Sequence, residues 1–331
     1  MKKIIFYSFL TIALFLFSCK GQDCGCISLD MSYDSPYDSP VWHPSGQLIG
    51  FNHTPVQSIY YDYHGKEECG CKPDISVKFY NDSAGFWLIN TDGTNMHRVL
   101  PYRLNQPAWS PDGKWIAYSN KAQIWIMPFD GEKFDTTAVE AIPFYGNAYN
   151  PTWSPDGKEI ALQNNLKNDS IKEGIWIYNI ETKKSELVGL NGSYPTWSLN
   201  ANSIVYLNNG DSIMSYSIVT KTSNLVRYIN IQNVENRNLR YSFDGATIGF
   251  VSYNAITNEM QLYKIKSDGT GLTKINTDAC YQFSWSPNGK IVYVNYDYSL
   301  IDKTKATLWI MDADGSSKHS ITYNNAAVIK D

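Results

Sequence analysis

The chain has 331 residues, and its 28 Lys and Arg against 32 Asp and Glu give a formal net charge of −4 at pH 7. This mildly acidic balance, without a basic run, argues against nucleic acid as a partner. The length is sufficient for one domain with an ample core, and no low-complexity linker divides it.

The N-terminus has the pattern of a secretory signal. Lys2 and Lys3 precede an apolar run over residues 4–17, and the small residue Ser18 stands before Cys19. The run is too short for a comfortable membrane span, so the pattern predicts a signal peptide over residues 1–18. Its removal would take away two lysines and lower the net charge to about −6.

Residues 16–19, Leu-Phe-Ser-Cys, resemble the lipobox of bacterial lipoproteins. The resemblance implies that Cys19 becomes the acylated first residue and that residues 19–36 form a tether. Several acyl chains on one residue would anchor the protein stably, and this anchor would be its sole contact with the membrane. The expected location is the cell envelope of a Gram-negative bacterium, at the outer membrane. The alternative is a signal peptide followed by an unmodified cysteine.

Four further cysteines form two Cys-x-Cys pairs, while Cys280 stands alone. Cys24 and Cys26 lie in the tether, and Cys69 and Cys71 lie in an insertion. An even set in an exported protein predicts disulfides, which would close loops of roughly 45 residues if they joined tether and insertion. A four-thiolate metal site or free thiols are the alternatives, although structural zinc usually takes Cys-x-x-Cys spacing. The pairing cannot be deduced, and no metal or other cofactor is predicted.

An aromatic residue recurs every 44 residues through most of the chain. A sixth copy begins around Trp42, which precedes the next aromatic by one period plus an insertion of 23 residues. Periods of 40 to 45 residues are typical of β-propeller blades, each built from four short strands. The aromatics at this spacing, called the grid aromatics below together with Trp42, are Trp109, Trp153, Trp197, Tyr241 and Trp285.

The residues around each grid aromatic predict the strands of one blade. In the second blade, Pro111 and Gly113 form a tight turn after Trp109, and strands are expected over 114–119 and 123–129. Those two strands are nearly continuous apolar runs, which suit sheets stacked between neighbours. The chain is therefore predicted to be all-β, a six-bladed β-propeller of four-stranded antiparallel blades, with grid aromatics wedged between blades. The propeller should span residues 37–323, with an insertion in the first blade over 56–83 and a C-terminal tail over 324–331.

The sequence WSPDGK followed by a hairpin of the type xxDGxxxxLT resembles the TolB-type propeller repeat, a relative of the WD repeats. The resemblance covers residues 37–323 and departs at residues 198–201 and at Tyr241. Such repeats occur in the Tol–Pal protein TolB, in tricorn-like proteases and beside prolyl-oligopeptidase-type hydrolases. The α/β domain that precedes the propeller of TolB has no counterpart here, so the resemblance implies a stand-alone propeller.

Catalytic motifs are scarce. The chain has five histidines and lacks a nucleophile elbow, a phosphate-binding glycine loop and a histidine–metal pair. Oligogalacturonate lyases use a related propeller with metal-binding histidines, and no matching histidine cluster occurs here. No catalytic residue is therefore predicted, and the protein is expected not to be an enzyme.

Binding residues are expected around one mouth of the propeller channel. The residues three and four positions before each grid aromatic should surround this mouth, where amides, tyrosines and an arginine could bind a peptide or sugar. The alternative is that these residues simply hydrate the channel. The candidates are Gln106, Tyr149, Asn150, Tyr194, Arg237, Tyr281 and Gln282.

Exposed aromatics are also expected in one sector of this face. The insertion of the first blade carries Tyr60, Tyr61 and Tyr63, and a loop of the sixth blade carries Tyr296 and Tyr298. A propeller does not need them for its fold, which suggests docking of another envelope protein or a peptide. The predicted function is a non-catalytic envelope lipoprotein whose propeller is a protein- or peptide-binding scaffold. The alternative is a carbohydrate-binding or carbohydrate-cleaving propeller that uses the channel mouth.

Overall fold

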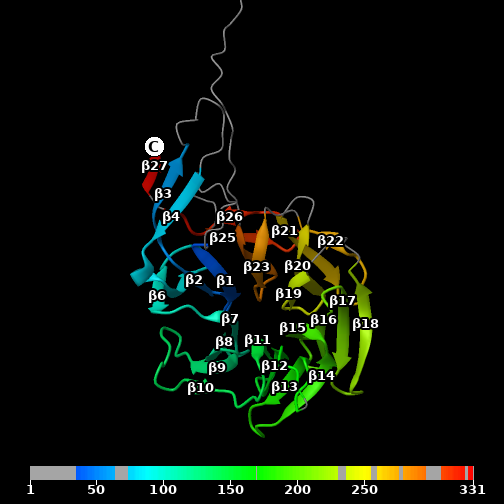
Figure 1. Ribbon diagram of the computed structural model, residues 1–331. Helices are drawn as coiled ribbons and strands as arrows, with labels where there is room; N and C mark the ends of the chain where they lie inside the picture. The colour runs from blue at the N-terminus through cyan, green and yellow to red at the C-terminus, as the bar shows by residue number, and fades with distance from the viewer. Residues whose placement is uncertain are drawn as a thin grey trace, which may run out of the picture.

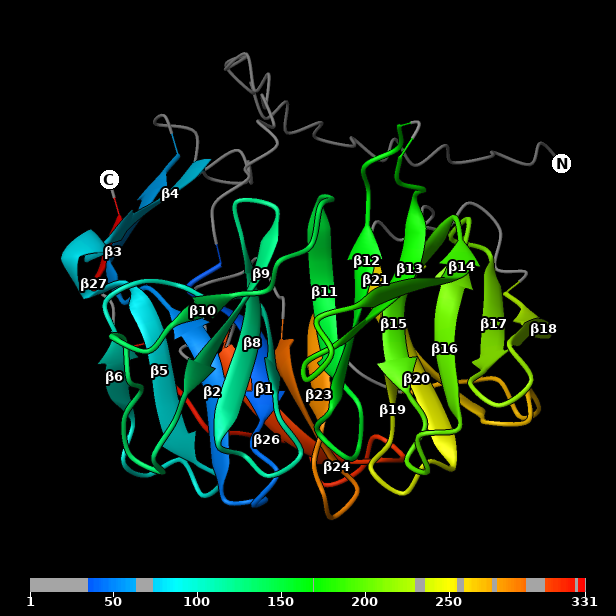
Figure 2. The same cartoon turned by 90° about the horizontal axis from the view of Figure 1, so that it is seen from below.

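The computed structural model describes residues 35–63, 74–168, 170–229, 236–254, 259–275, 279–295, 307–324 and 327–330. These residues form six four-stranded antiparallel sheets arranged around a central channel, and no α-helix occurs among them (Figures 1 and 2). The prediction of an all-β propeller is confirmed. Within the described ranges no helix is long and apolar enough to cross a membrane.

Each blade is built from consecutive strands, starting at the channel. Blade one contains β1 (Tyr37–Trp42), β2 (Leu48–His53), β5 (Gly85–Asn90) and β6 (His97–Leu100). Blade two contains β7 (Asn105–Trp109), β8 (Trp115–Asn120), β9 (Gln123–Pro128) and β10 (Glu140–Ala141). Blade three contains β11 (Ala148–Trp153), β12 (Glu159–Asn164), β13 (Gly174–Asn179) and β14 (Ser185–Leu190).

The other three blades repeat this order. Blade four contains β15 (Gly192–Trp197), β16 (Ser203–Asn208), β17 (Ser212–Ser217) and β18 (Thr222–Tyr228). Blade five contains β19 (Asn236–Tyr241), β20 (Thr247–Asn254), β21 (Glu259–Lys266) and β22 (Thr273–Lys274). Blade six contains β23 (Cys280–Trp285), β24 (Lys290–Asn295), β25 (Thr307–Asp312) and β26 (His319–Ser320).

The turn after each inner strand is set by its own side chains. In blade two, the Ser110 hydroxyl donates to Asp112 Oδ1 at 2.6 Å and accepts from the Trp115 backbone N–H at 2.9 Å. Gly113 has φ +71°, a conformation that glycine adopts without the usual steric penalty. The predicted turn chemistry therefore explains why every repeat begins with the same hairpin.

The hydrophobic core lies between blades. In the described residues, six apolar clusters each join two neighbouring blades, and the grid tryptophans lie in these clusters. Trp153 Nε1 also donates to the carbonyl of Ala108 in the preceding blade at 3.1 Å. The ring is closed where Phe51 of blade one packs with Val292 and Leu308 of blade six. The predicted wedging of these tryptophans is confirmed.

A seventh sheet stands beside blade one. It has the strand order β27-β3-β4, with β3 (Val56–Asp62), β4 (Asp74–Phe79) and β27 (Ala327–Lys330), and we call it the satellite sheet (Figure 2). A short 3₁₀ turn, η2 (Asn81–Ser83), leads from β4 back to blade one. β27 pairs with β3 in parallel. The predicted C-terminal tail over 324–331 is therefore wrong for residues 327–330, which form a strand.

Candidate functional site

The channel is lined by the inner strands of the blades (Figure 1). In each of them the pairing with the second strand is irregular just before the grid aromatic, for example between Tyr149 and Thr152. Such bulges redirect a side chain. The residue three positions before the grid aromatic has positive φ in five of the six described inner strands, at Ser39, Gln106, Asn150, Tyr194 and Asn238.

Two cavities follow the channel. The inner cavity has a volume of about 50 Å³, and a wider one of about 330 Å³ lies at the mouth. They share Ser39, Gln106 and Gln282, so the mouth leads into the inner cavity. The inner cavity is lined by Ser39, Pro40, Val41, Gln106, Pro107, Asn150, Asn238, Arg240, Gln282, Phe283 and Ser284. The mouth is lined by Asp38, Ser39, Asn105, Gln106, Ser119, Asn120, Lys121, Ala122, Tyr149 and Gln282.

Several predicted binding residues of the channel instead join neighbouring blades. Gln106 Oε1 accepts from the backbone N–H of Asn150 at 2.9 Å, across the junction between blades two and three. Gln282 Oε1 accepts from the backbone N–H of Ser39, across the junction between blades six and one. Asn150 Nδ2 donates to Gln163 at 2.8 Å. Gln106 and Gln282 thus satisfy backbone N–H groups near the bulges, while Asn150 holds a side chain of its own blade, which gives all three a structural role.

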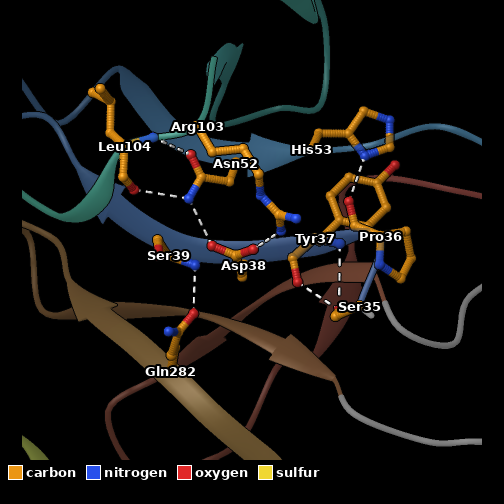
Figure 3. A network of polar contacts seen from close by, with 10 residues as sticks. All are labelled: Ser35, Pro36, Tyr37, Asp38, Ser39, Asn52, His53, Arg103, Leu104 and Gln282. Atoms are coloured by element: carbon orange, nitrogen blue, oxygen red, sulfur yellow. Dashed lines mark hydrogen bonds and ion pairs between the residues drawn. The ribbon is translucent and has the colours of Figure 1, made fainter. Parts of the chain in front are cut away.

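A second polar network joins blades one and two near the mouth (Figure 3). Asn52 Nδ2 donates to Asp38 at 2.7 Å and to the Leu104 carbonyl at 2.8 Å, and Asn52 Oδ1 accepts from the Leu104 N–H. Arg103 forms an ion pair with Asp38. The charge of Asp38 at the mouth is therefore neutralised by a neighbouring arginine rather than left for a ligand.

The remaining predicted mouth residues differ in exposure. Tyr149 is half-buried and lines the mouth, and Arg237 is exposed. Tyr194 is partly buried against the cluster between blades four and five. Tyr281 packs in the same way between blades five and six. The structure thus brings Tyr149 together with Gln106 and Gln282, while Tyr194 and Tyr281 serve mainly as packing residues.

The tyrosines of the insertion fall on different faces of the satellite sheet. Tyr61 is fully buried with Ile59, in a small cluster that Tyr63 partly covers. Tyr60 is half-buried. The prediction that Tyr61 contacts a partner is therefore wrong, because successive residues of a strand point to opposite faces and Tyr61 faces the core.

The satellite sheet also exposes apolar residues that the sequence analysis did not select. Val328 and Ile329 of β27 are 47% and 37% exposed, and Tyr80, directly after β4, is 51% exposed. The only signal available for β27 was a β-branched pair near the end of the chain. That signal does not reveal a pairing with a strand some 270 residues earlier.

Other predicted residues lie outside the described ranges. They include the signal peptide and nearly all of the tether. They also include Cys19, Cys24, Cys26, Cys69, Cys71, Tyr296 and Tyr298. Cys280 is described and is fully buried, and this burial raises the pKa of its thiol. Among the described residues there is no group of three or more His, Cys, Asp or Glu side chains placed to hold a metal ion.

His53 is the last residue of β2 in blade one, shortly before the insertion. Its ring stacks on Tyr37 with centroids 4.1 Å apart, and its Nδ1 donates to the Pro36 carbonyl at 2.8 Å (Figure 3). Burial among aromatic rings disfavours the charged imidazolium and lowers the pKa of His53 to about 4.

We expect the protein to lose stability as the pH falls from 6.5 to 4. In that window the unfolded state binds a proton at His53 that the folded state does not. The free energy of unfolding should therefore fall by about 3 kcal/mol. Urea unfolding at several pH values measures it. A His53→Gln variant removes the titrating group and should flatten the dependence. An equally steep dependence in this variant would assign the acid sensitivity to other groups.

Comparison with known proteins agrees with this architecture. The family model of the TolB β-propeller domain matches residues 85–330. An uncharacterized protein of Agrobacterium fabrum strain C58 is 26% identical over 235 residues, which cover 67% of this chain and 76% of that protein.

Two solved structures share the fold. A putative TolB from Agrobacterium tumefaciens has a TM-score of 0.57 at 23% identity, over 73% of this chain and 91% of its own. An oligogalacturonate lyase in complex with manganese has a TM-score of 0.53 at 9% identity, over 86% of this chain and 76% of its own. Since the family model covers well over half of the chain, the protein belongs to the TolB β-propeller family.

Proposed function

We propose that this protein is a non-catalytic, protein-binding propeller of the bacterial cell envelope. Its membership of the TolB β-propeller family supports an envelope protein with a protein partner. The signal pattern that ends at Cys19 supports export and a lipid anchor. The anchor at the outer membrane and the identity of the partner are part of this proposal.

The observation that carries the proposal is the exposed apolar surface of the satellite sheet. Val328, Ile329 and Tyr80 are each more than one third exposed in a sheet that the propeller ring does not need for closure. Val328 and Ile329 point to opposite faces of the sheet, so both of its faces expose apolar groups, and exposed apolar groups are typical of protein-binding elements. The two outer strands of this sheet, β27 and β4, also leave edges on which an extended peptide could pair.

The channel mouth is a less suitable docking surface for the same partner. The side-chain oxygens of Gln106 and Gln282 accept from the next blade, Asn150 is bound to Gln163, and Asp38 is paired with Arg103. The groups engaged in these contacts are therefore unavailable unless a ligand breaks a structural contact. We place the main docking surface on the satellite sheet, with Tyr60 at its margin. For the carbohydrate alternative, the likeness to the lyase concerns the fold alone, and no further observation favours it.

In-cell crosslinking tests this function. A photoreactive amino acid in place of Tyr80 should yield a crosslink to one specific protein. Exchanging both Val328 and Ile329 for Ser should reduce that crosslink at least tenfold, because interfaces draw much of their binding energy from a few apolar anchors. Both side chains are exposed, so the melting temperature of the propeller should hardly change.

The matched control carries the photoreactive group at Val219. This residue is 76% exposed between β17 and β18 of blade four, away from the satellite sheet. It should not capture the same protein. Equal crosslinking from Tyr80 and Val219, or a yield unaffected by the double exchange, would count against docking on the satellite sheet.

A further inference from the structure

One charged residue lines the inner cavity of the channel. Arg240 occupies the position directly before the grid aromatic of blade five. The equivalent positions of the other five blades hold uncharged residues, namely Val41, Ala108, Thr152, Thr196 and Ser284. The propeller fold therefore does not require a charge at this position, and among the six blades only blade five carries one.

The guanidinium of Arg240 has no acidic partner among the described residues. Among the described residues its Nη1 donates to the carbonyl of the adjacent Leu239 at 3.0 Å, and Tyr194 is the neighbour that favours its charged form. The ion pairs of the described side chains involve other cations, and the lining of the inner cavity contains neither Asp nor Glu. A guanidinium carries five N–H donors, so the described residues occupy only a small part of its donor capacity.

The Arg240 side chain is half-buried in the channel. Burial lowers the pKa of Arg240 from its ordinary value. A guanidinium nevertheless stays protonated in proteins, so the positive charge persists inside the channel. Partial removal of this charge from water is costly, and a bound counter-ion would offset the cost.

The neighbouring amides add donors to the same cavity. Gln106 and Gln282 use their Oε1 atoms as acceptors for backbone N–H groups of the next blade. Their amide nitrogens therefore remain as donors in a cavity that Arg240 also lines. A volume of about 50 Å³ exceeds the space of a single water and suits an anion of three or four heavy atoms.

We propose that the inner cavity is an anion-binding site in which the Arg240 guanidinium holds a carboxylate. Planar guanidinium and carboxylate groups pair through two parallel hydrogen bonds, so a carboxylate suits this site better than a spherical ion. The mouth cavity opens into the site, which leaves two sources of the ligand. These are a free small carboxylate and the C-terminal carboxylate of a peptide. The site does not depend on the docking surface of the satellite sheet.

Thermal unfolding of the full-length protein in detergent tests the site. Sodium formate should raise the melting temperature by about 3 °C when it replaces a bulky sulfonate salt at constant ionic strength. The shift should vanish in Arg240→Gln and in Arg240→Met. Two variants are used so that the test remains possible if one of them fails to fold. Arg237→Gln removes an exposed arginine from the same strand and should keep the shift.

Trialanine with a free or an amidated C-terminus then identifies the source. Stabilisation by the free acid at concentrations at least tenfold below those of formate, and none by the amide, supports a peptide terminus. Equal potency of formate and the free acid supports a free small carboxylate. No shift with either ligand in the wild-type protein, or an equal shift in the Arg240 variants, would overturn the proposal.

Discussion

Replacing Tyr61 with alanine should open the satellite sheet while the propeller stays folded. Tyr61 is fully buried, but its apolar cluster contains only residues of β3, β4 and the adjoining chain. Removal of a buried aromatic side chain costs about 3 kcal/mol or more, which corresponds to roughly a hundredfold increase in local opening. The six clusters between blades contain none of these residues, so the main melting transition should remain.

Hydrogen exchange at the amides of β3 and β27 measures this opening. Tyr61→Phe is the matched control, because no described residue forms a hydrogen bond with the buried Tyr61 hydroxyl. Its removal should leave exchange unchanged or slower, since an unsatisfied buried hydroxyl is itself unfavourable. Tyr60→Ala should also leave exchange nearly unchanged. If Tyr61→Ala lowers the melting temperature of the whole protein, the satellite sheet and the propeller unfold as one unit.

The Tyr61 variant also separates structure from function. If the satellite sheet is the docking surface, its opening should abolish the crosslink from Tyr80 even though the propeller remains intact. Tyr61→Phe should retain the crosslink. A partner captured equally well by the open and closed sheets would bind elsewhere, for example at the channel mouth around Tyr149.

Replacing Cys19 with alanine should abolish lipid attachment completely. Acylation of a lipoprotein requires the thiol of the first mature residue, and no other residue can replace it. Metabolic labelling with a palmitate analogue should mark the wild-type chain and leave Cys19→Ala unlabelled. We expect the variant to be recovered unprocessed or in the soluble fraction, because the several acyl chains hold the protein at the membrane.

Cys280→Ala provides the control for this labelling. Its thiol is fully buried in the cluster between blades five and six, where an acyltransferase cannot reach it. This variant should be labelled like the wild-type protein. Equal labelling of Cys19→Ala and the wild-type chain would reject the anchor.

The fold could be predicted because its determinants are local and repeated. The Ser110 hydroxyl, Asp112 and Gly113 form their turn through contacts within six residues. Blades three to six form the same serine-centred turn, whereas blade one uses His43. The grid aromatic then marks the end of each inner strand. One misjudged repeat would have changed little, since five others carry the same signal.

The candidate sites were predicted less well, because the type of a residue does not reveal which groups it contacts in the folded protein. Gln106 and Gln282 have the side chains of a binding mouth, yet their oxygens bind backbone groups of the next blade. Tyr60 and Tyr61 are identical in type and adjacent in sequence, and one is half-buried while the other is in a core. A one-residue change of register would exchange their roles, and only the packed sheet decides it.

The sequence alone determined the propeller, its 44-residue period and the place of the insertion in blade one, since these follow from turn chemistry and apolar patterning within each repeat. Only the tertiary structure decided that β27 returns to pair with β3 and that Arg240 lines the channel with no Asp or Glu partner in the part of the chain that is described. Both depend on groups far apart in the chain that come together when the ring closes. Local sequence propensity cannot predict such contacts, because the whole fold decides which residues lie next to a strand edge or a charged side chain.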